Sequence, residues 1–154
     1  MAKQKILVPY DLRHCEKRVL DFLINSFSSS RDIALTLFHC YAPLPEIDTD
    51  SSAVLGRLQD TMRSLKEELR KKESGLKWAR TYLLKSGFSN EQVDYIFKPL
   101  EKDISYEIIE VVQSKGYDMI VLCRSPGRIA RLLGRSVSYK LLSTLKDVAV
   151  CIIL

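Results

Sequence analysis

The sequence contains no long apolar run, and this absence excludes a transmembrane helix. No uninterrupted apolar stretch approaches the length of about 18 residues that a transmembrane helix needs. The first residues, MAKQKILVPYD, begin with basic side chains, but the apolar stretch before Asp11 is too short for a signal peptide. We therefore expect a cytoplasmic protein without a membrane partner.

The signatures of common catalytic centres are also missing. The chain lacks a nucleophile elbow, a clear acid–base pair and a Walker A lysine. We therefore assign no catalytic residue and expect slow ATP hydrolysis at most. The four cysteines show no CxxC spacing, and we expect reduced, partly buried thiols that behave as small hydrophobic side chains. They are Cys15, Cys40, Cys123 and Cys151.

Zinc is the one metal that the residue types suggest. His14, His39, Cys40 and Cys123 would lie near the ends of three neighbouring strands, and mixed histidine and cysteine ligands suit zinc. However, no two of them have a usual local ligand spacing, and adjacent residues in a strand point to opposite faces. We expect no metal site.

The size and composition of the chain are those of one globular domain. The 154 residues are 46% hydrophobic and 28% charged, enough for a single domain over residues 1–154 with a real core. The net charge of +5 favours anionic partners without choosing among them. We do not expect nucleic-acid binding, because no aromatic platform or recognition helix accompanies the basic residues.

Apolar runs and segments with helical periodicity alternate along the whole chain. The predicted strands are 5–10, 33–41, 93–98, 118–123 and Val148–Leu154, and the predicted helices are about 14–27, 52–85, 103–115 and 136–145. Every crossover is long enough for a helix. The pattern predicts an α/β fold of the Rossmann-like kind, with a doubly wound, five-stranded parallel sheet covered by helices on both faces.

The second predicted helix has an unusual apolar spacing. Its apolar side chains recur at alternating steps of three and four, with Lys72 at the missing position. They are Leu55, Leu58, Met62, Leu65, Leu69, Leu76, Ala79 and Leu83. This spacing resembles a coiled-coil seam, but only about four heptads fit. The favoured interpretation is one long crossover helix that lies on the sheet, bent near Gly75 and ending near Gly87.

The stretch DMIVLCRSPGRIARLLGRSVS, residues 118–138, runs from a strand through a glycine-containing loop into a helix. Free N–H groups in such a loop and the dipole of the following helix form an anion site. The loop also carries four arginines, Arg124, Arg128, Arg131 and Arg135. In a parallel sheet the ligand crevice lies beyond the carboxyl ends of the strands, where the strand order reverses.

KILVPYD, LTLFHCY, YDMIVLCRSPGRIARLLGRSVSYKLL and VAVCIIL resemble the universal stress protein family over nearly the whole chain. The resemblance implies a stress-response regulator with strand order 3-2-1-4-5, usually dimeric. It also implies that the chain is either an adenine-nucleotide binder or one of the members that bind none. The binders use a G-x2-G-x9-G-[S/T] loop after the fourth strand, an aspartate after the first strand and a valine after the second.

The resemblance places these features on particular residues. The aspartate is Asp11, which could instead cap the next helix, and the valine position falls on Cys40. The first glycine becomes Cys123, the second becomes Pro126 or Gly127, and the final Gly-Ser becomes Arg135-Ser136 with Gly134 before it. Compared with the family motif, the loop is one residue shorter. It also lacks the backbone freedom of the replaced glycines and, at Pro126, a backbone N–H group.

ATP or another adenine nucleotide is therefore the candidate ligand, with arginine forks replacing some lost backbone donors. The candidate nucleotide-binding residues are Pro9, Asp11, Cys40, Cys123, Arg124, Gly127, Arg128, Gly134, Arg135, Ser136 and Val137. The alternative is a dimeric interaction module of the same fold whose ligand site has decayed. In that case the dimer surface or the Pro/Asp/Ser loop at 42–52 is the working part.

The final strand, Val148–Leu154, is apolar and uncharged. At the edge of a sheet such a strand is an aggregation hazard unless another chain covers it. We expect a homodimer that pairs or packs through this strand.

Overall fold

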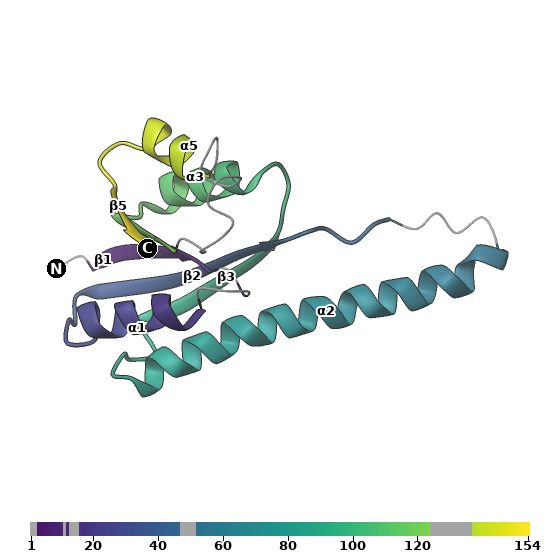
Figure 1. Cartoon of the computed structure of the whole chain (residues 1–154), viewed down its shortest axis with the longest axis horizontal. Coiled ribbons are helices and arrows are strands. Elements are labelled where there is room, and N and C mark those ends of the chain that lie inside the picture. Colours follow the sequence, from purple (N-terminus) through teal and green to yellow (C-terminus); the bar gives the residue numbers. More distant parts are fainter. Residues whose placement is uncertain (1–2, 11, 13–15, 47–51, 124–136) are drawn as a thin grey trace.

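The computed structural model describes residues 3–10, 12, 16–46, 52–123 and 137–154 (Figure 1). The order of elements is β1 (Gln4–Pro9), α1 (Glu16–Phe27), β2 (Ile33–Tyr41), α2 (Ser52–Lys85), β3 (Val93–Pro99), α3 (Ile104–Lys115), β4 (Met119–Cys123), α5 (Val137–Thr144) and β5 (Ala149–Ile153). Every strand and helix predicted from the sequence is present, with ends that differ by at most two residues.

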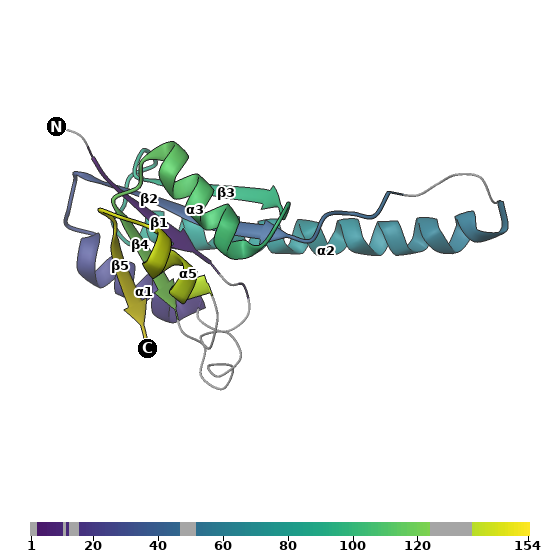
Figure 2. The same ribbon diagram turned by 90° about the horizontal axis from the view of Figure 1, so that it is seen from above.

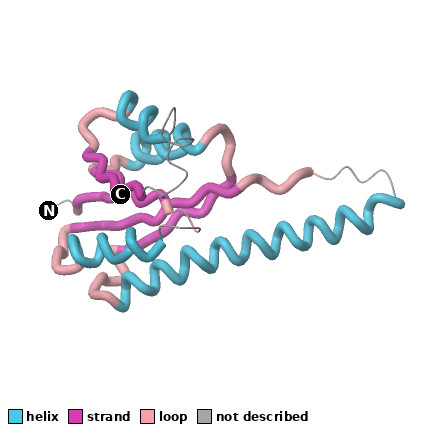
Figure 3. Tube along the Cα trace, in the orientation of Figure 1, coloured by secondary structure: helices cyan, strands magenta, loops and turns pink. Residues whose placement is uncertain are grey.

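The five strands form one parallel sheet in the order β3-β2-β1-β4-β5. Helices α1 and α2 cover one face, and α3 and α5 cover the other (Figures 1, 2 and 3). The prediction of a doubly wound sheet is therefore confirmed. Because β1 pairs with both β2 and β4, the strand order reverses between β1 and β4.

Two apolar clusters, one on each face, hold the layers together. The cluster under α1 and α2 includes Leu20, Leu23, Leu76, Ala79 and Leu83, packed on Ile6, Val8, Leu35 and Leu37. The cluster under α3 and α5 includes Ile108, Val112 and Leu141, packed on Leu7, Phe38 and Ile120. The strands are rich in branched apolar residues because both of their faces are buried.

Local signals fix the position of α3. Asp103 is the N-cap, and its side chain accepts a hydrogen bond from the Tyr106 N–H at 2.9 Å. Gly116 ends the helix in the left-handed conformation, with φ of 66°, and its N–H donates to the Val112 carbonyl. These caps fix the two ends of α3.

Helix α2 is continuous over Ser52–Lys85, and only its C-terminal half lies on the sheet (Figures 1 and 2). Leu76, Ala79 and Leu83 are fully buried there. A Cβ atom at Gly75 would lie 2.8 Å from Leu12 Cδ2, so the glycine lets the helix approach the segment after β1. The prediction that this helix lies on the sheet holds for its C-terminal half alone. Neither α2 nor another helix in the described part of the chain is long and apolar enough to cross a membrane.

Candidate functional site

The carboxyl ends of β1, β2 and β4 meet at one edge of the sheet. Pro9 ends β1 and Cys123 ends β4, while Cys40 is the penultimate residue of β2. The Tyr10 N–H donates to the Phe38 carbonyl at 2.8 Å, which continues the β1–β2 pairing to the site. This is the topological switch point, where doubly wound sheets form their ligand crevice.

The structure brings some of the predicted site residues together and separates one of them. Cys40 and Val137 both pack on the α3/α5 side of the sheet. Pro9 shares that side, because residues two apart in a strand share a face and Leu7 belongs to the same cluster. Cys123 packs on the α1/α2 side instead. The other predicted site residues lie outside the described part of the chain, namely Asp11, Arg124, Gly127, Arg128, Gly134, Arg135 and Ser136.

Cys40 lies beside a charged pair that sequence analysis did not single out. Lys98 is its cross-strand partner on β3, and the Lys98 Nζ lies 2.7 Å from Glu107 Oε2. Burial raises the pKa of the Cys40 thiol to about 11, with a further upward contribution from Glu107 and a smaller downward one from Lys98. The thiol is therefore neutral at physiological pH, which makes it a small apolar contact surface and not a nucleophile.

The carboxylate of Glu107 is fully buried and ties three segments together. Its Oε1 accepts from the N–H groups of Glu101 at 3.0 Å and Lys102 at 3.4 Å, and its Oε2 forms the ion pair with Lys98. The Lys98 contact is the largest cause that lowers the pKa of Glu107, and the backbone donors add to it against the opposing effect of burial. An ionised carboxylate thus joins β3, the β3–α3 loop and α3 next to Cys40.

A sequence signal for this pair was available. Glu107 follows Ile104 by three residues and precedes Val111 by four, so it occupies the apolar face of the helix. A charged residue on that face needs a partner, because an unpaired buried charge is very costly. What the sequence could not show is that Lys98 would supply the partner from another element.

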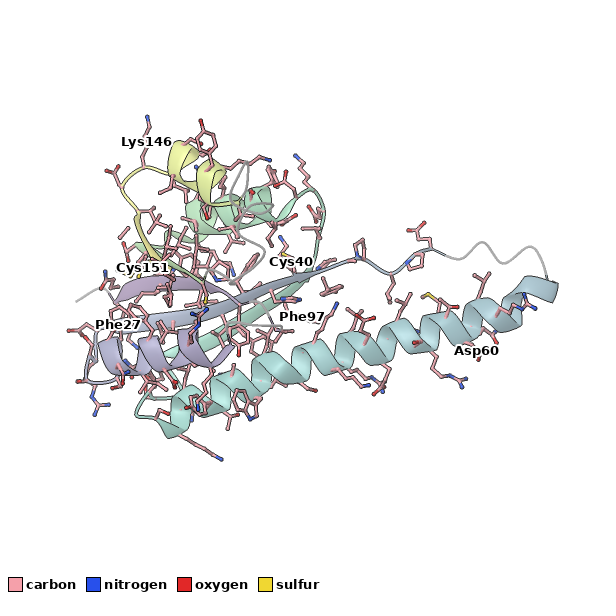
Figure 4. All side chains as sticks on the ribbon, viewed as in Figure 1. Phe27, Cys40, Asp60, Phe97, Lys146 and Cys151 are labelled. Atoms are coloured by element: carbon pink, nitrogen blue, oxygen red, sulfur yellow. The ribbon has the colours of Figure 1, made fainter. Side chains whose placement is uncertain are left out.

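Three of the four residues weighed for zinc lie in the described part of the chain, namely His39, Cys40 and Cys123. The His39 Nδ1 lies 3.1 Å from the Tyr10 carbonyl, and its ring stacks on Phe97, with centroids 6.0 Å apart. Cys40 and Phe97 lie on opposite sides of the sheet (Figure 4). No group of three or more His, Cys, Asp or Glu side chains is arranged to hold a metal among the described residues, which do not include His14.

The cysteines differ from the expectation at one position. Cys40 and Cys151 are free thiols, as expected. Cys123 is disulfide-bonded, so the expectation of a reduced thiol is wrong there. The wide spacing of the cysteines in the sequence carried no signal for this bond, because pairing depends on how the fold brings them together.

Comparisons with known proteins agree with this architecture. The family model described as the universal stress protein family matches residues 3–151. A universal stress protein from Archaeoglobus fulgidus in complex with dAMP has a TM-score of 0.64 at 15% identity, with 100% of both chains covered. A universal stress protein in complex with cAMP has a TM-score of 0.63 at 17% identity and covers 100% of this chain and 98% of its own.

A third structure, the universal stress protein UspA from Lactobacillus plantarum, has a TM-score of 0.64 at 13% identity, with 100% of this chain and 99% of its own covered. No curated protein gives a significant sequence match. Identities this low support the fold alone, whereas the family model spans almost every described element. The chain belongs to the universal stress protein family.

Proposed function

We propose that this protein binds an adenine nucleotide, with ATP as the first candidate, at the carboxyl edge of its sheet. The observation that carries the proposal is the reversal of strand order between β1 and β4, because doubly wound sheets bind their ligands beyond the carboxyl ends of the strands at such a reversal. Two relatives with this fold are complexes with dAMP and cAMP.

The residues of the site divide by chemistry. Pro9, Cys40 and Val137 share one side of the sheet, and all three are partly buried. A neutral thiol and two apolar side chains suit contact with an uncharged purine ring. Asp11 would accept from a ribose hydroxyl or from the adenine amino group. The stretch that follows Cys123 would hold the phosphates, through the backbone at Gly127 and Gly134, the Ser136 hydroxyl and the guanidinium groups of Arg124, Arg128 and Arg135.

The test is a titration of the purified protein with ATP, AMP and GTP, followed by isothermal calorimetry and by thermal shift. We expect ATP to bind and to raise the melting temperature, and we expect GTP to bind more weakly because its base differs at the proposed purine contact. The variant Arg128→Ala with Arg135→Ala should lose at least tenfold in ATP affinity and less in AMP affinity, because AMP has fewer phosphates to contact.

Arg57→Ala is the matched control, since Arg57 is exposed on α2 in the half that lies beyond the sheet. It should leave ATP affinity unchanged. The proposal is wrong if millimolar ATP gives neither heat nor thermal protection, and if native mass spectrometry of freshly purified protein shows no retained nucleotide.

A second proposed activity is self-association through the C-terminal strand. β5 is an edge of the described sheet and pairs there with β4. Large apolar side chains are exposed on the preceding helix, on β5 and directly after it, at Tyr139, Leu142, Ile152 and Leu154. An exposed apolar edge of this kind is suited to a second copy of the chain. This surface is also what favours the alternative of an interaction module that binds no nucleotide.

Ile152→Lys tests the strand interface, and Tyr106→Lys is its control because both side chains are 39% exposed. We expect a dimer of the unmodified chain by native mass spectrometry and sedimentation, at least tenfold weaker in Ile152→Lys and unchanged in Tyr106→Lys. Equal dissociation constants for the two variants would contradict the interface.

A further inference from the structure

The N-terminal half of α2 carries an apolar stripe that the rest of the described chain does not cover. Leu58, Met62, Leu65 and Leu69 continue the three- and four-residue spacing of the buried positions at 76, 79 and 83. None of the four belongs to either core cluster of described residues. Each is partly buried, whereas every other residue from 56 to 71 is exposed.

This half of α2 extends well past the sheet (Figures 1 and 2). Asp60, which is exposed to solvent near the start of the helix, lies far from every strand (Figure 4). Among the described segments, only residues 42–46 also extend past the sheet on that side (Figure 1). A helix with one apolar stripe and a polar remainder gains most of its stability from packing that stripe, so a partner for it is expected.

We propose that this stripe, formed by Leu58, Met62, Leu65 and Leu69, pairs with the same stripe of a second copy as a short antiparallel coiled coil. The period supports a helical partner, because an apolar repeat of 3.5 residues keeps a seam facing another helix along its whole length.

Charges along the helix select the antiparallel direction. In a parallel pair in register, Lys72 would face Lys72 of the other copy across the seam, and Glu68 would lie beside Glu73 of the other copy. Both contacts are repulsive. The antiparallel arrangement avoids both.

In the antiparallel register Met62 faces Leu65 of the second copy and Leu58 faces Leu69. Lys72 then falls opposite position 55, at the end of the seam, where its ammonium can stay bonded to Glu68 at 3.2 Å in its own helix. Beside the seam, Lys66 lies near Gln59 and Glu68 near Thr61 of the second copy, so no like charges meet.

The length of the free segment matches this register. Residues 55–72 span about 27 Å of helix. At its other end the free segment meets the sheet, because Glu73 Oε1 accepts from the Tyr95 hydroxyl at 3.1 Å and Leu76 is buried. In the antiparallel pair position 54 of one copy lies opposite position 73 of the other. The helix of one copy therefore begins where the other copy's helix reaches its own sheet.

The experiment uses charge-complementary variants of the full chain and measures association by sedimentation velocity and native mass spectrometry. All variants carry Ile152→Lys as well, so that the strand edge does not contribute. We expect Ile152→Lys alone to retain a dimer, and Met62→Lys and Leu65→Glu each to weaken it at least tenfold. An equimolar mixture of these two variants should restore the dimer, because Lys at 62 then faces Glu at 65.

Ser64→Lys is the matched control, since Ser64 is exposed on the opposite side of the helix from the stripe, and it should leave the dimer unchanged. Circular dichroism of each variant should show an unchanged fold, because the substituted side chains lie outside both cores. Three results would overturn the proposal: an Ile152→Lys protein that is monomeric at all concentrations, equal effects of Met62→Lys and Ser64→Lys, or a mixture that fails to reassociate.

Discussion

The buried pair of Lys98 and Glu107 makes the strongest stability prediction. Replacing Lys98 by methionine keeps most of the side-chain volume but leaves the Glu107 carboxylate buried without its cation. Its two N–H donors, from Glu101 and Lys102, remain. Loss of one partner from a buried ion pair costs about 3–5 kcal/mol. The Lys98 side chain is 26% exposed, so water can reach this end of the pair and we expect about 3 kcal/mol.

Urea denaturation followed by circular dichroism measures this loss, and thermal unfolding should show a fall in Tm of about 6–12 °C for a chain of this size. Lys140→Met is the control, because it removes the same kind of side chain from an ion pair with Asp103 whose members are 53% and 56% exposed. An exposed pair of this kind contributes about 0–1 kcal/mol. Adding Glu107→Gln to Lys98→Met should recover at least half of the loss, because the amide oxygen still accepts from the backbone.

The pH dependence has a definite sign. The pKa of Glu107 is lowered below its ordinary 4.5 in the folded chain, so the pair stabilises fully above that pH and its contribution is lost as the pH falls through the folded pKa. In Lys98→Met burial would instead raise the pKa of Glu107. The stability gap between the two proteins should therefore begin to narrow above pH 4.5, as the pH falls through the raised pKa of the variant, and should narrow further below pH 4.5, as it falls through the lowered pKa of the unmodified chain. A loss in Lys98→Met no larger than that in Lys140→Met would refute the reasoning.

Three further predictions concern single positions. The pKa of Cys40 is about 11 against an ordinary 9.0. Its thiol should therefore react with iodoacetamide at pH 8 on the order of 100-fold more slowly in the folded chain than in urea. Equal reaction rates, measured by mass spectrometry, would contradict the burial of Cys40. Gly116→Ala should cost about 1–2 kcal/mol in urea denaturation, because φ is 66° there, whereas Gly56→Ala, with no atom within 4 Å of the new methyl group, should raise helicity by circular dichroism. Tyr95→Phe should cost about 0.5–1.5 kcal/mol through loss of its hydrogen bond to Glu73, and an unchanged denaturation midpoint would show that this bond contributes nothing.

The fold could be predicted because its signals are local. The run at 33–41 is apolar on both faces, which is what a central parallel strand requires, and Asp103 and Gly116 mark the two ends of one helix in the sequence itself. Short-range patterns of this kind can be recognised without knowing which helix or strand packs against the segment.

The features that escaped prediction depend on the partner. The apolar spacing on α2 is the same whether a sheet or another helix covers it, so the sequence could not show that its fully buried positions begin at Leu76. Pairing of Glu107 with Lys98 links two elements, and the disulfide bond at Cys123 also depends on the folded arrangement. The family resemblance implied the strand order, and with it the β1–β4 reversal where we propose the site. It did not indicate the side of the sheet on which Cys123 packs.

The strand order determines how many other copies one subunit can bind. β5 forms one edge of the sheet, while α2 packs over β2 and β3 toward the other edge and extends away from it (Figure 1). The two surfaces proposed for self-association therefore lie at opposite ends of the molecule, and each is self-complementary. A subunit with two such ends is bivalent: copies joined alternately through strand and helix form a row that either closes on itself or continues to grow. The size of the resulting particle would then depend on protein concentration, and blocking either end alone would reduce it to a pair.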